Sequence, residues 1–331
     1  MSKHNRRTAL LAFVGALLAM PTAHAEWYRR VDDGIMGTRI SVELWAGDRE
    51  LGARAIEAVL AEMRRIDELM STYKPSSELS KVNDEAASHP VAISPELFKL
   101  LETSLEYSEI TAGAFDITYA SVGYLYDFRR HVHPTQGAIE KALPAVNFRH
   151  VLLDREHTTV SFSQAGVRID LGGIAKGHSV DRAIGILKSL GIAHAVVSAG
   201  GDSRVLGDRF GKPWVIGIRN PRAADSNAVI TRIPLEDEAI STSGDYERFF
   251  DEGGVRYHHI IDPKTGHSAS KVLSATIIGP TATRTDGLSK TAFVLGPEEC
   301  IKLIDRLGDV DAVLVTADGR VLYSKGLRPP D

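Results

Sequence analysis

The amino-acid sequence predicts an α+β fold: one domain with mixed or antiparallel sheets and flanking helices. Amphipathic helical patterns lie before residue 191, whereas residues 195–323 are rich in short β-branched runs. Helices do not alternate regularly with these runs, as they would in a doubly wound parallel sheet. With 331 residues and 43% hydrophobic content, the chain is long enough to bury a large core.

The first half of the chain predicts a strand followed by three helices. Residues 38–45 alternate between apolar and polar side chains, which is typical of a half-buried strand. Apolar residues at helical spacing predict a helix over 56–70. The next helix begins at Ser94, a capping residue that precedes a proline, and ends near Gly113. The third is predicted over residues 180–190.

Turn residues divide the second half into short predicted strands. These cover residues 195–198, 214–218, 228–233, 257–261 and 273–278. Near the C-terminus, residues 312–316 and 320–323 flank an Asp-Gly turn and are predicted to form a hairpin. Residues 129–150 are the most loop-like stretch of the chain.

Charge and cysteine content exclude several classes of protein. The formal net charge is −4, and no basic run occurs beyond the first few residues, so a nucleic-acid-binding surface is not expected. Cys300 is the only cysteine, which excludes an internal disulfide and a thiolate cluster for zinc or iron–sulfur.

The N-terminus has the pattern of a secretory signal peptide. Cationic residues precede the uncharged run 9–20, and the small residues Ala23 and Ala25 suit a cleavage point. We therefore predict a signal peptide over residues 1–25, a folded domain over 26–331, and a periplasmic location. Removal of three positive and no negative side chains would lower the formal charge from −4 to −7.

The apolar run is too short for a permanent membrane span. Its twelve residues would form a helix of about 18 Å, against about 30 Å of hydrocarbon. An uncleaved inner-membrane anchor is the alternative interpretation. A lipid anchor is excluded because no cysteine stands at the cleavage point.

Residues 167–179 form the first segment with unusual chemistry. We expect a strand, a glycine-rich turn and the start of a helix, an arrangement that lets backbone amides approach a phosphate. Lys176 adds a positive charge. The spacing of Gly172 and Gly177 is close to that of a nucleotide P-loop, but His178 stands where that motif requires lysine. The alternative is a turn whose glycines serve packing alone.

The second segment, residues 257–267, contains adjacent histidines. Neighbouring residues of a strand point to opposite faces, so His258 and His259 are not expected to share one metal ion. One histidine facing a site suits general-base catalysis. Asp262 is expected to serve the turn that follows.

The third segment, residues 282–295, places Asp286, Ser289 and Lys290 three and four positions apart. They would share one face of a helix, and oxygen ligands in such an arrangement suit magnesium. The alternative is that Asp286 or a nearby threonine caps the helix.

Taken together, these segments resemble the ApbE family of FAD:protein FMN transferases. The resemblance spans about residues 31–316, and several motifs occur in the family's order. Those motifs are residues 36–38, 71–73, 113–118, 170–177, 200–202, 259–263 and 286–289. The resemblance implies a flavin transferase domain, T-fold-like in architecture. Such a domain splits FAD at its pyrophosphate, moves FMN onto a threonine or serine hydroxyl of a partner protein, and releases AMP.

The resemblance also implies the site residues. Positions that contact FAD correspond here to Met36, Tyr73, Ala114, Phe115, Asp116, Asp170, Lys176, His259 and Ile260. The Gly173 carbonyl and Asp286 match positions that hold magnesium. Of the FAD-contacting residues, Met36, Tyr73 and Phe115 offer flat or apolar surfaces to the ring systems, and Asp116 and Asp170 offer acceptors to hydroxyls.

One position departs from the family's pattern. A threonine that ligates the metal in the family corresponds to Lys290 here, and an ammonium cannot ligate a cation. Ser289 or Thr291 could supply the oxygen, water could fill the gap, or Lys290 could partly replace the metal as a phosphate counter-charge. We expect Mg²⁺ to be retained with weaker affinity, with Ca²⁺ as second choice.

Attack by an acceptor hydroxyl requires a base. We predict that His259 fills this role, with Asp286 or a neighbour as the alternative. The acceptor is expected to be a membrane-associated redox protein. Two other functions stay open: an FAD pyrophosphatase that yields FMN and AMP, and a non-catalytic periplasmic flavin-binding protein.

Overall fold

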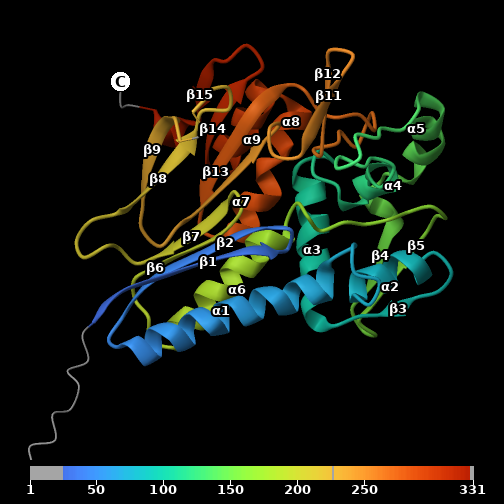
Figure 1. Ribbon diagram of the computed structural model, residues 1–331. Helices are drawn as coiled ribbons and strands as arrows, with labels where there is room; N and C mark the ends of the chain where they lie inside the picture. The colour runs from blue at the N-terminus through green and yellow to red at the C-terminus, as the bar shows by residue number, and fades with distance from the viewer. Residues whose placement is uncertain (1–24, 226, 329–331) are drawn as a thin grey trace, which may run out of the picture.

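The computed structural model describes residues 25–225 and 227–328, and it is built around one large antiparallel sheet (Figure 1). Every neighbouring pair of its eight strands is antiparallel. In sheet order the strands are β1 (Glu26–Ile35), β2 (Thr38–Ala46), β6 (Ala195–Ala199), β7 (Asp202–Leu206), β10 (Ala239–Gly244), β13 (Val272–Gly279), β14 (Asp311–Thr316) and β15 (Val321–Tyr323). The predicted α+β class is confirmed.

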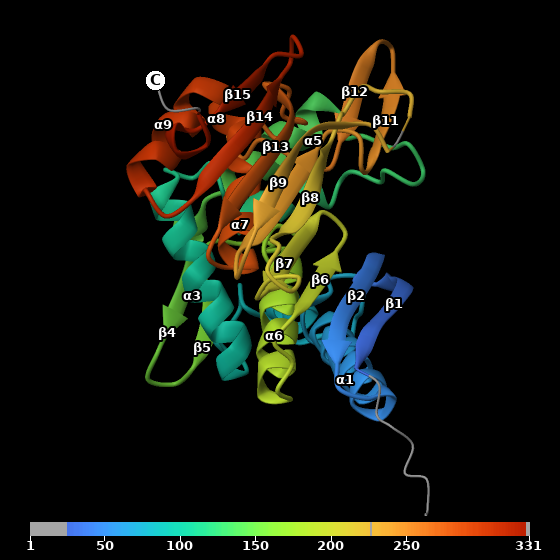
Figure 2. The same ribbon diagram turned by 90° about the vertical axis from the view of Figure 1, so that its left-hand side faces the viewer.

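Helices cover one face of this sheet, and a hairpin covers the other (Figure 2). The helices are α1 (Arg49–Met70), α6 (Ala175–Ser189), α7 (Ala282–Ser289), α8 (Thr291–Leu295) and α9 (Pro297–Leu307). The hairpin pairs β8 (Trp214–Arg219) with β9 (Val229–Leu235). Successive residues of a strand point to opposite faces of the sheet, so the sheet has a hydrophobic core on each side. Val197 and Ile277 face the helices, whereas Val196 and Ile278 face the hairpin.

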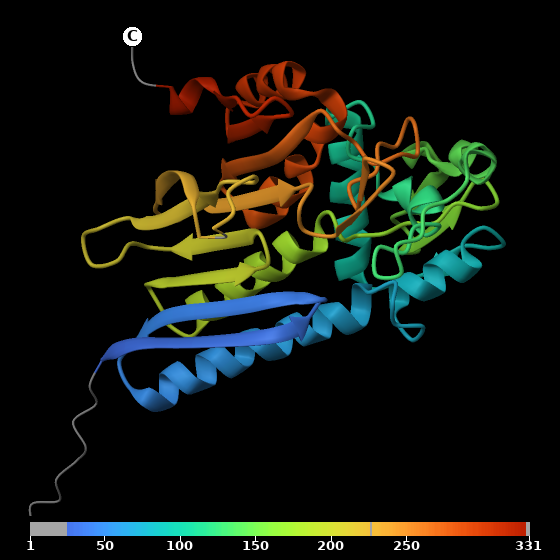
Figure 3. The ribbon, with the colours of Figure 1, turned by 45° about the horizontal axis from the view of Figure 1, so that its top comes forward.

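A second region packs beside the helical face, and its helix α3 lies on the side nearest to the large sheet (Figure 3). Its elements are α2 (Glu78–Glu85), α3 (Pro95–Ile110), α4 (Ala120–Gly123), α5 (Gln136–Ala142), and a sheet of β3 (Val91–Ala92), β5 (Thr159–Phe162) and β4 (Val151–Asp154). Helix α1 joins the two regions, because Met63 packs under the large sheet while Ile66 and Met70 pack in the second core.

Short elements complete the described residues. They are the hairpin of β11 (Phe249–Glu252) and β12 (Val255–His258), and the 3₁₀ turns Ile117–Tyr119, Leu143–Ala145, Phe148–His150 and Lys325–Leu327. None of the helices within 25–225 and 227–328 has the length and apolarity needed to cross a membrane. All of the predicted signal peptide except Ala25 lies outside the described residues, so it stays a prediction.

Three sequence-based boundaries were wrong. Residues 129–150 contain α5 and two 3₁₀ turns, so they are not simply a loop. Residues 167–170 do not pair with a neighbouring strand. The backbone groups of Ile169 hydrogen-bond with the Asn83 side chain, and the N–H of Asp170 donates to the Ile117 carbonyl. The strand predicted over 257–261 ends at His258. Contacts between segments far apart in the sequence determine the conformation of such stretches, and a local sequence pattern cannot predict those contacts.

Helices α6 and α7 approach closely at Gly177. A Cβ atom on Gly177 would overlap the carbonyl oxygen of Ala282 and lie 2.8 Å from the Asp286 Cβ. Any larger residue would therefore push the two helices apart. Because Lys176 and Asp286 stand on either side of this contact, the helix spacing also sets the distance between their charged groups.

We predict that Gly177→Ala lowers the free energy of unfolding by about 1–3 kcal/mol, because the added methyl group is overpacked against backbone. The matched control is Gly185→Ala on the same helix, where a Cβ meets nothing within 4 Å. That variant should gain up to about 1 kcal/mol from helix propensity. Urea denaturation measures both. Equal shifts of the same sign would contradict the close contact.

Candidate functional site

A cluster of two lysines and two aspartates lies where α6 begins. Lys176 Nζ is 2.5 Å from Asp202 Oδ2 and 3.5 Å from both carboxylate oxygens of Asp286. Lys290 Nζ makes an ion pair with Asp286 Oδ1. The charges come from three elements: α6, the start of β7, and α7 with the residue that follows it. Asp202 was not predicted as a site residue, although the motif 200–202 contains it.

Asp286 stands at the centre of this cluster. Its side chain has no exposed surface, and its Oδ2 accepts the N–H of Gly177 at 3.0 Å, in the first turn of α6. Thr281 caps α7 by accepting the N–H of Arg284, so the alternative of a threonine cap is confirmed, whereas Asp286 is not the cap. The sequence predicted that backbone amides at the start of α6 would bind a phosphate, but the Gly177 N–H donates to the Asp286 carboxylate instead.

Three of these charged groups, Lys176, Asp202 and Asp286, have a shifted pKa. Burial alone would raise the pKa of Asp286, but the Lys176 and Lys290 ammonium groups bring it below its usual value. Burial and the Asp286 charge raise the pKa of Asp202 despite Lys176. The pKa of Lys176 is raised because both carboxylates outweigh the effect of its burial. Lys176 is therefore an ammonium and Asp286 a carboxylate at neutral pH.

The glycine-rich turn brings Phe115 and Lys290 together. A Cβ on Gly173 would lie 3.4 Å from Phe115 Cε2 and 3.8 Å from Lys290 Cε. Phe115 is buried and packs edge-to-face against Tyr107 at 6.1 Å between ring centroids. Because Gly173 has no side chain, the Phe115 ring and the carbon chain of Lys290 can both pack against its backbone. His178, which follows this turn, instead pairs with Glu96 at 2.9 Å.

Asp170 holds the same turn from the other side. Its oxygens accept from the Thr72 hydroxyl at 2.9 Å, the Tyr119 hydroxyl at 3.0 Å and the Gly172 N–H at 2.7 Å. Burial and the Asp170 charge raise the pKa of Tyr119 well above its usual value, so its hydroxyl stays a donor. Tyr73, next to Thr72, is 86% exposed and leaves its ring available to a ligand.

Asp116 serves the loop that carries Phe115. It is buried, and its oxygens accept the N–H and hydroxyl of Thr118 and the Phe148 N–H at 2.9 Å. Burial raises its pKa in spite of these bonds. Ala114 is also buried. Both therefore shape the loop, and no side-chain oxygen of Asp116 lacks a partner.

The two adjacent histidines have different environments. His258 Nε2 lies 2.6 Å from the Ala269 carbonyl, and its Nδ1 accepts the Ile260 N–H at 3.3 Å, so this ring supports the backbone. His259 Nδ1 is buried and has no hydrogen-bond partner among the described residues. Burial, assisted by the charges of His258, Arg248, Lys290 and Lys176, lowers the pKa of His259 to about 3. Its imidazole is therefore neutral.

The β1–β2 turn approaches the segment that leads to His259. Met36 adopts a left-handed φ of 54°, and the carbonyl of Gly37 accepts from Arg248 Nη2 at 3.3 Å. The Arg248 carbonyl in turn accepts the His259 N–H at 3.1 Å. Arg248 was not predicted as a site residue. Ile260 was predicted as a site residue, but its side chain is buried in the core on the helical side of the sheet, where it supports the neighbouring His259.

The oxygen atoms near Asp286 do not fit a divalent cation. The Ser289 hydroxyl bonds with Ser243 at 2.8 Å and with the Asp286 carbonyl at 2.9 Å, and the Thr291 hydroxyl donates to Leu288 at 2.6 Å. Both hydroxyls are buried, and the Asp286 oxygens already face ammonium groups. Within 25–225 and 227–328, no group of three or more His, Cys, Asp or Glu side chains suits a metal.

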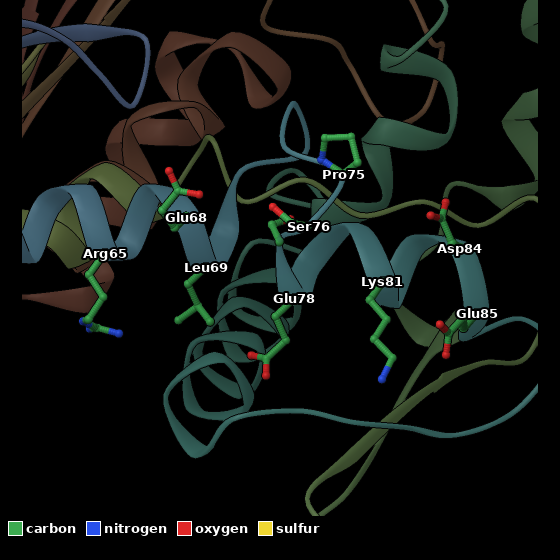
Figure 4. Close-up of a pocket in the computed structure, with 10 residues that line it drawn as sticks. Arg65, Glu68, Leu69, Pro75, Ser76, Glu78, Lys81, Asp84 and Glu85 are labelled. Atoms are coloured by element: carbon green, nitrogen blue, oxygen red, sulfur yellow. The ribbon is translucent and has the colours of Figure 1, made fainter.

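A shallow depression elsewhere on the surface does not belong to this cluster. It lies along α1 and α2, has a volume of about 620 Å³, and is lined mostly by charged side chains (Figure 4). Arg65, Glu78 and Lys81 point to one side of the two helices there. None of the predicted site residues lines it.

Comparison with known proteins relates most of the chain to one family. The ApbE family model matches residues 36–314. An FAD:protein FMN transferase of Treponema pallidum is 34% identical over 290 residues, covering 82% of this chain and 80% of that protein. The crystal structure of the ApbE protein of Thermotoga maritima aligns with a TM-score of 0.83 at 35% identity, over 91% of this chain and 98% of that one. The flavin transferase ApbE of Vibrio cholerae aligns with a TM-score of 0.80 at 30% identity, with the same coverage.

We predict that Asp170→Ala lowers the free energy of unfolding by about 1–3 kcal/mol, because the Tyr119 hydroxyl and the Gly172 amide lose their acceptor. Thr72→Val removes only one of the three donors and should cost about 1 kcal/mol or less. Urea denaturation of both variants provides the comparison. An equal loss in the two variants would show that Asp170 does not organise the turn.

Proposed function

This chain belongs to the ApbE family, and we infer from its site that it transfers FMN from FAD to an acceptor protein. The observation that supports this most directly is the half-buried Lys176 ammonium, held by Asp202 and Asp286 beside the Gly172–Gly173 turn. A fixed positive charge next to a glycine-rich turn suits the pyrophosphate of a dinucleotide. The sequence relatives extend this inference from a phosphate site to flavin transfer.

We propose that the pyrophosphate of FAD binds at Lys176, and that the ring systems use the apolar surfaces around it. Phe115 lies against Gly173, close to the charged cluster, and Tyr73 exposes its ring beside the Thr72–Asp170 contact. Met36, in the β1–β2 turn, is partly buried against the cores on either side of the site and is the third apolar side chain that we assign to the ring systems. Aromatic and thioether side chains supply the flat, polarisable contacts that an isoalloxazine or adenine requires.

The reaction needs few groups once FAD is positioned. A threonine or serine oxygen of the acceptor forms a bond to the phosphorus of the FMN half, and the bond from that phosphorus to the bridging oxygen breaks. AMP leaves with the electron pair, and the hydroxyl proton passes to the imidazole of His259, which is neutral. Lys176 neutralises charge that develops on the phosphates, which is the main task in phosphoryl transfer.

The finer details of the function are also proposals. The predicted signal peptide supports action in the periplasm on a membrane-associated redox protein. The family resemblance predicts Mg²⁺, with Ca²⁺ as second choice, but the oxygens around Asp286 do not fit either ion. The reaction above is therefore written with the chain's own residues alone.

We predict that incubation with FAD, Mg²⁺ and a flavinylation substrate protein adds the mass of one FMN to a threonine or serine of that protein and releases one AMP. Intact-mass and peptide mass spectrometry measure the first product, and chromatography measures the second. Release of FMN and AMP without a mass gain would show the pyrophosphatase instead. FAD binding without cleavage would show a flavin-binding protein.

We predict that His259→Gln lowers kcat by about 10²-fold or more and changes the Kd for FAD by a much smaller factor, because the base acts on the proton during the chemical step. His267→Gln is the matched control, since His267 is exposed and contacts only Gln136 through its ring. Steady-state kinetics and flavin fluorescence titration separate the two effects. A similar loss in both variants would exclude His259 as the base.

The depressed pKa of His259 gives a second prediction. A base must be neutral to act, and kcat/KM reports its pKa in the free protein. With that pKa lowered to about 3, the neutral form persists far below the usual value of 6.5. We therefore expect kcat/KM to show no acidic limb between about pH 5 and pH 8. A limb near pH 6.5 that His259→Gln abolishes would contradict the environment described here.

A further inference from the structure

We propose that the Lys290 ammonium supplies the positive charge beside Asp286 at the FAD pyrophosphate, so that this protein binds FAD without a divalent cation. This inference rests on the proposed function, because it concerns the same phosphate site. It follows from where the Lys290 side chain lies and from the atoms that surround it.

Lys290 is fixed on three sides. Its ammonium makes an ion pair with Asp286 Oδ1 and donates to the Asp286 carbonyl oxygen at 3.1 Å. Its carbon chain lies against the backbone of Gly173, where a Cβ would be 3.8 Å from Cε and 3.9 Å from Cδ. The last residues of α7 place the two charges four positions apart, so they share one helical face. The ammonium is therefore held by the fold.

One donor of Lys290 stays available. An ammonium carries three N–H groups, and the contacts with Asp286 Oδ1 and the Asp286 carbonyl use two of them. The side chain is 17% exposed, whereas that of Asp286 has no exposed surface. A phosphate oxygen approaching the cluster can thus meet the ammonium and cannot meet the carboxylate. Lys290 presents its third donor to that oxygen.

A cation would have to displace this arrangement. Ser289 and Thr291, the nearest alternative oxygen donors, are buried and bonded to Ser243, Asp286 and Leu288. The carboxylates of Asp202 and Asp286 are balanced by Lys176 and Lys290. A divalent ion would meet two ammonium groups, and neither the Ser289 nor the Thr291 hydroxyl would be free to ligate it. The charge of the two lysines also reaches His259, whose pKa both of them lower.

The test compares FAD binding with and without metal. Flavin fluorescence titration of the wild-type protein in EDTA and in millimolar Mg²⁺ should give the same Kd within about twofold. Lys290→Thr should weaken FAD binding in EDTA by about tenfold or more, the loss of a charged hydrogen bond, and Mg²⁺ should restore it. Isothermal titration with MgCl₂ alone should show binding to Lys290→Thr and none to the wild-type protein.

Controls separate this inference from its premise. Lys264→Thr removes an exposed lysine from a nearby turn and should leave every titration unchanged. Thermal melting confirms that Lys290→Thr is folded. If EDTA abolishes FAD binding to the wild-type protein, or MgCl₂ binds to it directly, the inference is overturned. If FAD binds equally in EDTA and Mg²⁺ but no FMN reaches an acceptor in either, the proposed function fails while the role of Lys290 stands.

Discussion

The close contact of α6 with α7 at Gly177 is the constraint on which the site depends. It puts the first turn of α6 against Asp286, so the Gly177 N–H and the Lys176 ammonium both reach the same carboxylate. Asp202 completes the arrangement from the start of β7. Glycine is required there because any side chain would separate the helices and, with them, the charges that we propose bind the phosphates.

Burying two carboxylates beside two ammonium groups is a poor way to gain stability. Desolvation of such a pair often equals or exceeds its attraction, and well-packed apolar side chains would serve the fold as well or better. The cluster is therefore best explained by what it does for a ligand. Each lysine is held by more than one oxygen, so neither has to be ordered when FAD arrives, and the entropy cost of binding falls.

The sequence predicted those parts of the molecule that local chemistry determines. The Ser94 cap with its following proline marks the start of α3, and the Asp-Gly turn joins β14 to β15 as expected. Strand β10 was missed, because its small and polar residues carry no strand pattern and it is defined by its two neighbours in the sheet. The four-residue spacing of Asp286 and Lys290 predicted that they share one helical face, although not that they form an ion pair. The contact of Lys176 with Asp202 spans 26 residues, and no local pattern predicts it.

Replacing a bound ion by a lysine changes what the activity depends on. A cation site is occupied only as far as the cation concentration allows, whereas Lys290 is part of the chain and is in place whenever α7 has formed. The ammonium carries one charge where Mg²⁺ carries two, and it offers a single free donor where an ion offers several positions. Lys176 compensates in part, because it lies within 3.5 Å of the same carboxylate and adds a second charge. Two fixed monovalent cations on neighbouring helices thus provide the total charge of one divalent ion, and their spacing is set by Gly177 rather than by coordination geometry.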